Sequence, residues 1–147
     1  MNSFGLKVRG KYDDGNDNWI GKNNISSWCV AYHGVGRGQS SKKVKEIIGL
    51  ICKNRFKPGC GQTHKNCSDI NHQGKKVGDG VYFCQEIKKA EEYAGIININ
   101  GLNYKVVLMT RIKPSSLRRC NDGPYYMVTS GTYDDTRPYR ILFKKID

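Results

Sequence analysis

Apolar residues occur along this chain in short runs separated by polar, glycine-rich stretches. The first run, 28–33, is typical of a β-strand and ends at His33-Gly34. It is followed by apolar positions that recur at the i, i+3, i+4, i+7 spacing of one helical face, namely Val44, Ile47, Ile48 and Ile51. Ser40 and Ser41 can cap such a helix. The pattern therefore predicts a strand that ends in His33 and an amphipathic helix that ends before the turn at 57–59.

The second half of the chain is predicted to be rich in strands. A strand over 81–83 precedes a short helix over 86–94, and Gly95 is expected to stop that helix. After a turn at 98–103, the longest β-like run, 104–112, is the expected central strand, and Pro114 closes it. Two more strands are expected at 125–129 and 139–146, with a loop at 130–135 between them.

These elements predict an α+β fold with mostly antiparallel strands. A chain of 147 residues fits one domain, which we expect to span 25–147. Residues 1–24 are a polar lead-in, in which we expect one edge strand and the apolar anchors Trp19 and Ile20. The loop at 59–76 has no sustained period and is expected to cover a face of the domain.

Two glycines precede the strand at 81–83. Gly78 and Gly80 allow positive φ or close approach to a ligand, and the strand then sends Tyr82 and Phe83 to opposite faces. One aromatic ring can lie in the core while the other forms the wall of a site. The alternative is a plain turn followed by a buried strand.

The chain is strongly basic, with 25 Lys and Arg against 13 Asp and Glu and a net charge of +12. This balance favours a polyanionic partner such as nucleic acid, a nucleotide or an acidic protein face. The positive residues are scattered in pairs without a long basic run, so nucleic acid is a possible partner rather than an obligate one. A soluble basic surface without such a partner is the alternative.

No stretch approaches the roughly 20 apolar residues of a membrane span, and the N-terminus lacks the apolar core of a signal peptide. We expect an intracellular protein, cytoplasmic or nuclear, that is monomeric and has no membrane contact. The six cysteines are accordingly expected to be free thiols or metal ligands.

The cysteines suggest two further sites. Cys84 follows the aromatic strand directly, but no neighbouring pattern predicts a lowered pKa, so we interpret it as a small buried residue rather than a nucleophile. Four residues, Cys52, Cys60, His64 and Cys67, have a spacing that could provide a tetrahedral zinc site, against an interpretation with no metal.

Several short motifs together resemble a known family. The order is Tyr32-His33-Gly34, a helix, the glycine turn and strand at 78–83, the segment 89–93, a hydrophobic strand and a final Tyr-x-Val strand at 126–128. This order is similar to the catalytic domain of the poly(ADP-ribose) polymerase-type, diphtheria-toxin-like ADP-ribosyltransferases. The similarity extends from His33 to the C-terminus.

The resemblance implies a split, mostly antiparallel core with short helices around an NAD cleft. It also implies that His33 and Tyr82 hold NAD, that the backbone of Gly34 clamps the nicotinamide amide, and that Tyr93 stacks on the nicotinamide ring. Ala90 occupies the position of a serine that binds the carboxamide in the family, and losing one such hydrogen bond costs about 1 kcal/mol.

The third catalytic position departs from the family. In this chain the catalytic triad implied by the resemblance would be His33, Tyr82 and Tyr125, because Tyr125 stands where the family has a glutamate. A tyrosine can hydrogen-bond a ribose hydroxyl, but it is neutral at pH 7 and cannot act as a carboxylate base. A carboxylate from a neighbouring loop, Asp122, Asp134 or Asp135, is an alternative source of negative charge.

The resemblance thus implies an enzyme that transfers single ADP-ribose units from NAD to a protein or nucleic-acid acceptor and releases nicotinamide. The alternative is a related module with little or no turnover that binds NAD, ADP-ribose, nucleic acid or an acidic protein.

Overall fold

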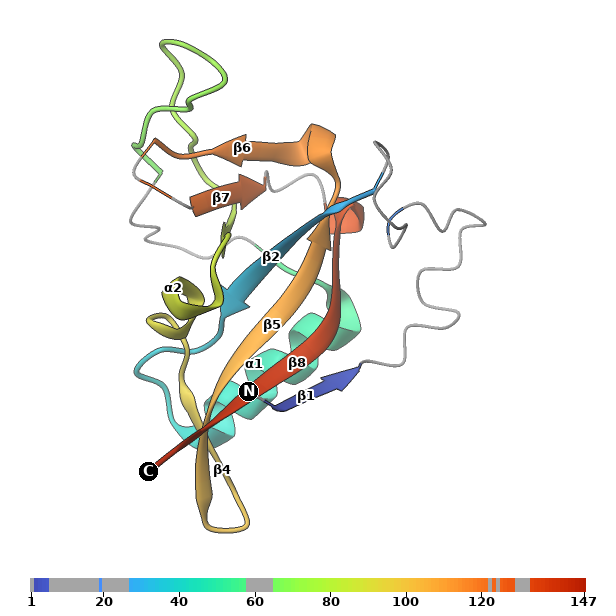
Figure 1. The fold of residues 1–147 in the computed structure, drawn as a ribbon, viewed down its shortest axis with the longest axis vertical. Coiled ribbons are helices and arrows are strands. Elements are labelled where there is room, and N and C mark those ends of the chain that lie inside the picture. Colours follow the sequence, from blue (N-terminus) through green and yellow to red (C-terminus); the bar gives the residue numbers. More distant parts are fainter. Residues whose placement is uncertain are drawn as a thin grey trace.

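The described residues form one antiparallel sheet with a long helix and a short one (Figure 1). The computed structural model describes residues 2–5, 19, 27–57, 65–121, 123, 125–128 and 133–147. The strands are β1 (Asn2–Gly5), β2 (Cys29–Gly34), β3 (Val81–Cys84), β4 (Ile96–Ile99), β5 (Leu102–Ile112), β6 (Leu117–Arg119), β7 (Tyr125–Val128) and β8 (Thr136–Ile146). The helices are α1 (Ser41–Asn54) and α2 (Ile87–Glu91).

The strand order is β1-β8-β5-β2-β3-β7-β6, and β4 pairs with β5 beside this path. All strand pairs among the described residues are antiparallel. The predicted α+β class with mostly antiparallel strands is therefore confirmed. The longest predicted run lies inside the sheet as β5, between β8 and β2.

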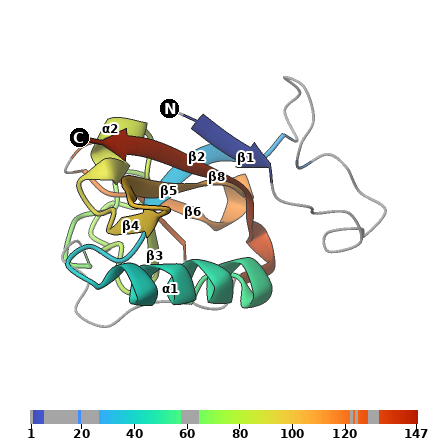
Figure 2. The ribbon, with the colours of Figure 1, turned by 90° about the horizontal axis from the view of Figure 1, so that it is seen from below.

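Helix α1 lies along one face of the sheet (Figure 2). Its N-cap is Ser40, whose hydroxyl accepts the backbone N–H of Lys43 at 3.1 Å. Val44 and Ile48 are buried, as the helical spacing predicts, because they point toward the sheet.

The sheet separates two hydrophobic clusters. The α1-side core contains Ala31, Val35, Val44, Ile48, Phe56, Val81, Phe83, Ile97, Val106, Leu108, Ile112 and Val128. The α2-side core contains Val77, Cys84, Ala90, Ala94, Val107, Cys120, Met127 and Leu142, with Tyr32, Tyr82 and Tyr93 packed against it. Successive residues of β3 alternate between the two cores, with Val81 and Phe83 on the α1 side and Tyr82 and Cys84 on the α2 side, because side chains in a strand alternate between its faces.

The predicted helix over 86–94 is too long. Helix α2 ends at Glu91, and the chain continues in a turn in which Tyr93 N–H donates to the Ala90 carbonyl at 3.1 Å. Gly95 does not cap the helix. Its N–H instead donates to the Val35 carbonyl at 2.6 Å, and a side chain there would collide with Gly36. Tertiary packing against the end of β2 therefore stops the helix early.

The predicted turn over 98–103 is a tighter hairpin. Strand β4, which the sequence reading missed, pairs with β5 through a connection at Asn100 and Gly101. These residues have φ of 51° and 82°, the positive values of a two-residue hairpin turn. The Asn-Gly dipeptide was the available signal. The three-residue strand β6 was also missed.

The last strand begins earlier than predicted, at Thr136 instead of Tyr139. A register shift between Met109 and Thr110 leaves Tyr139 as the extra residue of a bulge, and Pro138, whose missing N–H is tolerated beside a bulge, precedes it. Strand β7 covers 125–128, and residue 129 lies outside the described residues.

The N-terminal lead-in contributes to the same sheet. Its predicted edge strand is present as β1, which pairs with β8. Trp19 is buried, and its ring contacts Trp28 and Tyr139. Ile20 lies outside the described residues. In the described part of the chain, neither helix is long and apolar enough to cross a membrane.

Candidate functional site

The sheet opens between β2 and β3. Within the residues that the structure describes, these neighbours share a single registered pair, Tyr32 with Cys84. Beyond it, His33 and Gly34 remain paired with β5, while Val81 and Tyr82 remain paired with β7. We call this opening the split. It lies beside the two motifs that carry the family resemblance.

The imidazole of His33 bridges the split. Its Nδ1 lies 2.7 Å from the backbone carbonyl oxygen of Tyr82. A carbonyl only accepts hydrogen bonds, so Nδ1 carries the proton and Nε2 of the neutral ring is an acceptor. The ring contacts Phe56 and Phe83 with centroid distances of 5.0 and 5.5 Å. Backbone and aromatic contacts therefore fix the orientation of His33.

Burial lowers the pKa of His33 below its usual 6.5, and the hydrogen bond to Tyr82 only partly opposes this effect. The ring is consequently neutral at pH 7. A hydroxyl group is the kind of ligand that Nε2 can bind as an acceptor.

The lowered pKa of His33 predicts a loss of stability in mild acid. The unfolded chain takes up a proton near pH 6.5 while the folded protein does not. Stability is therefore complete above pH 6.5 and falls below it, by at most about 1.4 kcal/mol per pH unit, until the folded pKa is reached. Urea unfolding should show that the free energy of unfolding falls more between pH 7.5 and pH 5.5 in the wild type than in His33→Gln. Equal losses would contradict this prediction.

A pocket of about 430 Å³ lies next to the split on the α1 side. Its lining comes from α1 and the three residues after it, and from the strand ends around the split: Ile47, Leu50, Ile51, Asn54, Arg55, Phe56, Lys57, His33, Gly80, Val81 and Tyr82. The walls are mainly apolar, whereas Asn54, Arg55 and Lys57 supply polar and positive groups. Such a pocket suits a ligand with a flat apolar part and a negative charge.

Arg55 adopts an unusual backbone conformation at this pocket, with φ of 67° and ψ of −175°. This region is almost restricted to glycine, and strain of this kind often marks a functional position. Its guanidinium pairs with Asp134, whose side chain is 86% exposed. An ion pair so open to water is weak, so a phosphate could replace the aspartate.

The three candidate carboxylates differ in their relation to the pocket. Asp134 forms an ion pair with Arg55, and Arg55 lines the pocket. Asp135 instead accepts a hydrogen bond from the Ser116 hydroxyl and lies 3.9 Å from the Lys113 ammonium, so it supports the start of β8. Asp122 lies outside the described residues.

Tyr82 faces the opposite side of the sheet from His33. Its ring packs against the α2-side core, and its hydroxyl donates to the Gly78 carbonyl at 2.8 Å. Burial and the nearby charge of Asp79 raise the pKa of Tyr82 to about 12, although Arg118 acts in the other direction. The phenol is therefore neutral. Phe83 is fully buried on the α1 side, so the prediction that the two rings face opposite sides of the sheet is confirmed.

Gly34 and Gly80 approach protein backbone closely, whereas Gly78 serves the turn. Gly78 has a positive φ of 75° with nothing within 4 Å of an added side chain, while a side chain on Gly80 would collide with the Val128 carbonyl. At Gly34 a side chain would overlap the Ala90 carbonyl and crowd Tyr93. Gly34, Ala90 and Tyr93 are thus brought together, with Tyr93 packed on the same core as Tyr82.

Tyr125 lies on the strand next to Tyr82, where its backbone is paired with Cys84. Its side chain is outside the description. The three predicted catalytic positions, His33, Tyr82 and Tyr125, therefore lie on three adjacent strands, β2, β3 and β7. The side chains of His33 and Tyr82 project to opposite faces.

The cysteine positions bear on the alternative sites. Cys84 is buried, and burial raises the pKa of its thiol to about 11, as expected for a core residue. Of the zinc candidates, Cys52 packs against the α1-side core and Cys67 against the α2-side core. Cys60 and His64 lie outside the described residues.

Sequence reasoning missed three residues at this site. Phe56 and Arg55 follow the helix directly, and only the fold turns them back onto His33 and the pocket. Arg118 belongs to β6 and acts on Tyr82 from across β7. The paired arginines at 118 and 119 were visible in the sequence, but their strand was not.

A scan against protein-family models finds no match for this chain, and no curated protein matches it.

Proposed function

We propose that this protein is a mono-ADP-ribosyltransferase that cleaves NAD at the split between β2 and β3. The observation that carries the proposal is His33, a neutral and oriented acceptor at a pocket whose rim bears Arg55 and Lys57. NAD offers matching groups, namely ribose hydroxyls, a pyrophosphate and two flat rings.

In this proposal the pocket takes the adenosine end of NAD. A ribose hydroxyl donates to Nε2 of His33, and the pyrophosphate pairs with Arg55 and Lys57. The adenine packs on the apolar wall formed by α1 and Phe56. In this assignment the hydrogen-bond acceptor, the two cations and the apolar wall of the pocket each contact a matching group of NAD.

The nicotinamide end extends past the strand ends to the tyrosines of the α2 side. Tyr82 and Tyr93 pack on one core there, which supports a stacking role for both rings. Breaking the bond between nicotinamide and ribose develops positive charge on the ribose, so orientation and electrostatic stabilisation are the main tasks of the site. Neutral Tyr82 and Tyr125 fit these tasks, and neither can act as a carboxylate base.

A second function, binding without turnover, is favoured by one observation. The Ala90 carbonyl is packed against Gly34, whose backbone would clamp the nicotinamide amide in an active enzyme. A module of this kind would hold NAD or ADP-ribose in the pocket and release no nicotinamide.

The test is incubation with NAD labelled in the adenylate part, with parallel measurement of free nicotinamide. We expect transfer of single units or slow nicotinamide release by the wild type, and loss of both in His33→Ala. His72→Ala is the matched control, because the His72 side chain is 55% exposed and binds Asp69 in a surface loop.

If neither transferred label nor free nicotinamide rises above background, the proposed enzymatic activity is overturned. Calorimetric titration with NAD then tests the second function, which predicts binding by the wild type and by His72→Ala, and weaker binding by His33→Ala. Equal affinity for NAD in all three proteins would show that the pocket at His33 takes part in neither function.

A further inference from the structure

Asp134 places a negative charge on the guanidinium that the proposed function assigns to the pyrophosphate. It belongs to the 3₁₀ turn Tyr133–Asp135, which precedes β8, and its carboxylate forms an ion pair with Arg55. The Arg55 side chain is only 23% exposed, whereas that of Asp134 is 86% exposed. The aspartate therefore occupies the place on the guanidinium that an anionic ligand of the pocket would take.

The backbone holds Arg55 at the rim of the pocket. Its N–H donates to the Ile51 carbonyl at 2.8 Å in the last turn of α1, and the ring of the next residue, Phe56, packs against His33. Between these two contacts the chain turns through the positive φ of Arg55, a conformation that glycine adopts without strain. Because the backbone is fixed on both sides of Arg55, the exposed aspartate is the more mobile member of the ion pair.

The turn that carries Asp134 is anchored through its neighbour Asp135. The Asp135 carboxylate accepts a hydrogen bond from the Ser116 hydroxyl, and its carbonyl accepts the N–H of Lys113 at 2.8 Å. Asp134 itself lies at the exposed part of the turn. Release of Arg55 therefore needs only a rotation of the Asp134 side chain into water, and the turn itself stays in place.

We propose that Asp134 is a resident counter-ion of the pocket, which a phosphate group of the ligand must displace from Arg55. Asp134 thereby determines the selectivity of the pocket between ligands with and without phosphates. This inference rests on the proposed function, in which the pyrophosphate of NAD pairs with Arg55 and Lys57. The aspartate lowers the affinity for ADP and NAD and leaves the affinity for adenosine unchanged. Its role is ligand selection rather than that of a catalytic carboxylate.

The expected size of the effect follows from the exposure of the ion pair. Water screens an exposed pair, so breaking it should cost about a two- to fivefold change in affinity. A phosphate is a stronger partner for an arginine than a carboxylate is, because it carries more charge and more acceptor oxygens. The ion pair therefore weakens the binding of a phosphate ligand without closing the pocket to it.

The test compares two ligands that differ only in their phosphates. ADP and adenosine are titrated by calorimetry into the wild type and into Asp134→Asn at pH 7.5 and low salt. Asp134→Asn should bind ADP about two- to fivefold more tightly and should bind adenosine with wild-type affinity. ADP replaces NAD in this experiment, so neither turnover nor the nicotinamide end contributes to the measured affinity.

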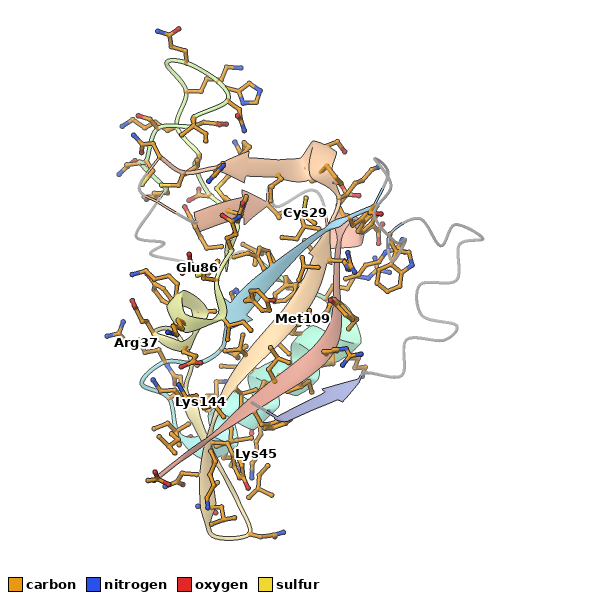
Figure 3. The ribbon with its side chains drawn as sticks, viewed as in Figure 1. Cys29, Arg37, Lys45, Glu86, Met109 and Lys144 are labelled. Atoms are coloured by element: carbon orange, nitrogen blue, oxygen red, sulfur yellow. The ribbon has the colours of Figure 1, made fainter. Side chains whose placement is uncertain are left out.

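Glu86→Gln is the matched control for Asp134→Asn. Glu86 is an exposed acid at the N-cap of α2, on the other side of the sheet from α1 (Figure 2, Figure 3). Its replacement removes the same charge at a distance from the pocket, so the affinity for ADP should not change. A gain equal to that of Asp134→Asn would show a general effect of net charge and would overturn the proposal.

Arg55→Gly tests whether the effect of Asp134 passes through the ion pair. Glycine fits the backbone conformation at this position, so the variant should fold, and its melting temperature checks this. It should bind ADP more weakly than the wild type, and the further change Asp134→Asn should not alter that affinity. A gain from Asp134→Asn that persists in the Arg55→Gly background would contradict displacement from Arg55.

The outcomes separate this inference from the proposed function. Equal affinity for ADP in the wild type and in Asp134→Asn would overturn the role of Asp134 and leave the assignment of the pocket intact. A gain for adenosine as large as that for ADP would overturn the selectivity, because the aspartate would then obstruct both ligands alike. If neither ligand binds any of the proteins, the assignment of the pocket to the adenosine end of NAD is overturned, and this inference with it.

Discussion

Replacing Phe83 by alanine is expected to lower the free energy of unfolding by about 3 to 5 kcal/mol, the usual cost of emptying a fully buried phenylalanine site. Phe83 has no exposed surface, and its ring meets those of Phe56 and His33 with centroid distances of 5.0 and 5.5 Å. Strands β2 and β7 hold the surrounding backbone, so the cavity cannot collapse fully. Urea unfolding at pH 7.5 measures the change.

Ile96→Ala is the control for Phe83→Ala. Ile96 lies on β4 and is 45% exposed, so its truncation should change stability by about 0.5 kcal/mol or less. A loss below about 1.5 kcal/mol in Phe83→Ala would mean that the ring is not a core residue. It would also contradict the conclusion that contact with the Phe83 ring helps to fix the orientation of His33.

Gly34→Ala is expected to lower the free energy of unfolding by about 3 kcal/mol, which is at the upper end of the usual cost of an overpacking substitution. The backbone of Gly34 has no positive φ, so the cost is steric. The added methyl group would overlap the Ala90 carbonyl oxygen and lie 2.8 Å from the Ala94 nitrogen. These are backbone atoms and can move only if α2 moves. Because Tyr93 would move with them, NAD binding should weaken in the folded fraction.

Gly49→Ala provides a comparison of opposite sign. Gly49 is an exposed glycine within α1, and nothing lies within 4 Å of the space that a methyl group would fill. Alanine there should stabilise the protein by about 1 kcal/mol, because it favours the helix. Thermal unfolding of both variants in one buffer measures the difference. A Gly34→Ala variant as stable as the wild type would show that α2 does not pack tightly on β2.

Local patterns predicted the parts of the site that depend on near neighbours in the chain. The spacing of Val44 and Ile48 predicted the buried face of α1, and the period of two predicted that Tyr82 and Phe83 face opposite sides. By contrast, α2 was predicted too long. Its end depends on the contact of Gly95 with Val35, a residue 60 positions earlier. No local signal can report such a contact.

The sequence by itself determined the α+β class, the basic charge, the order of the motifs around His33 and Tyr82, and the neutral residue at position 125. Only the tertiary structure decided that the sheet opens beside Tyr32 and Cys84 and that Arg118 lies in register with Tyr82 across β7. The physical reason is that hydrophobic period and turn chemistry act over a few residues. Strand register and the facing of side chains from distant strands follow instead from how the whole sheet buries its two cores.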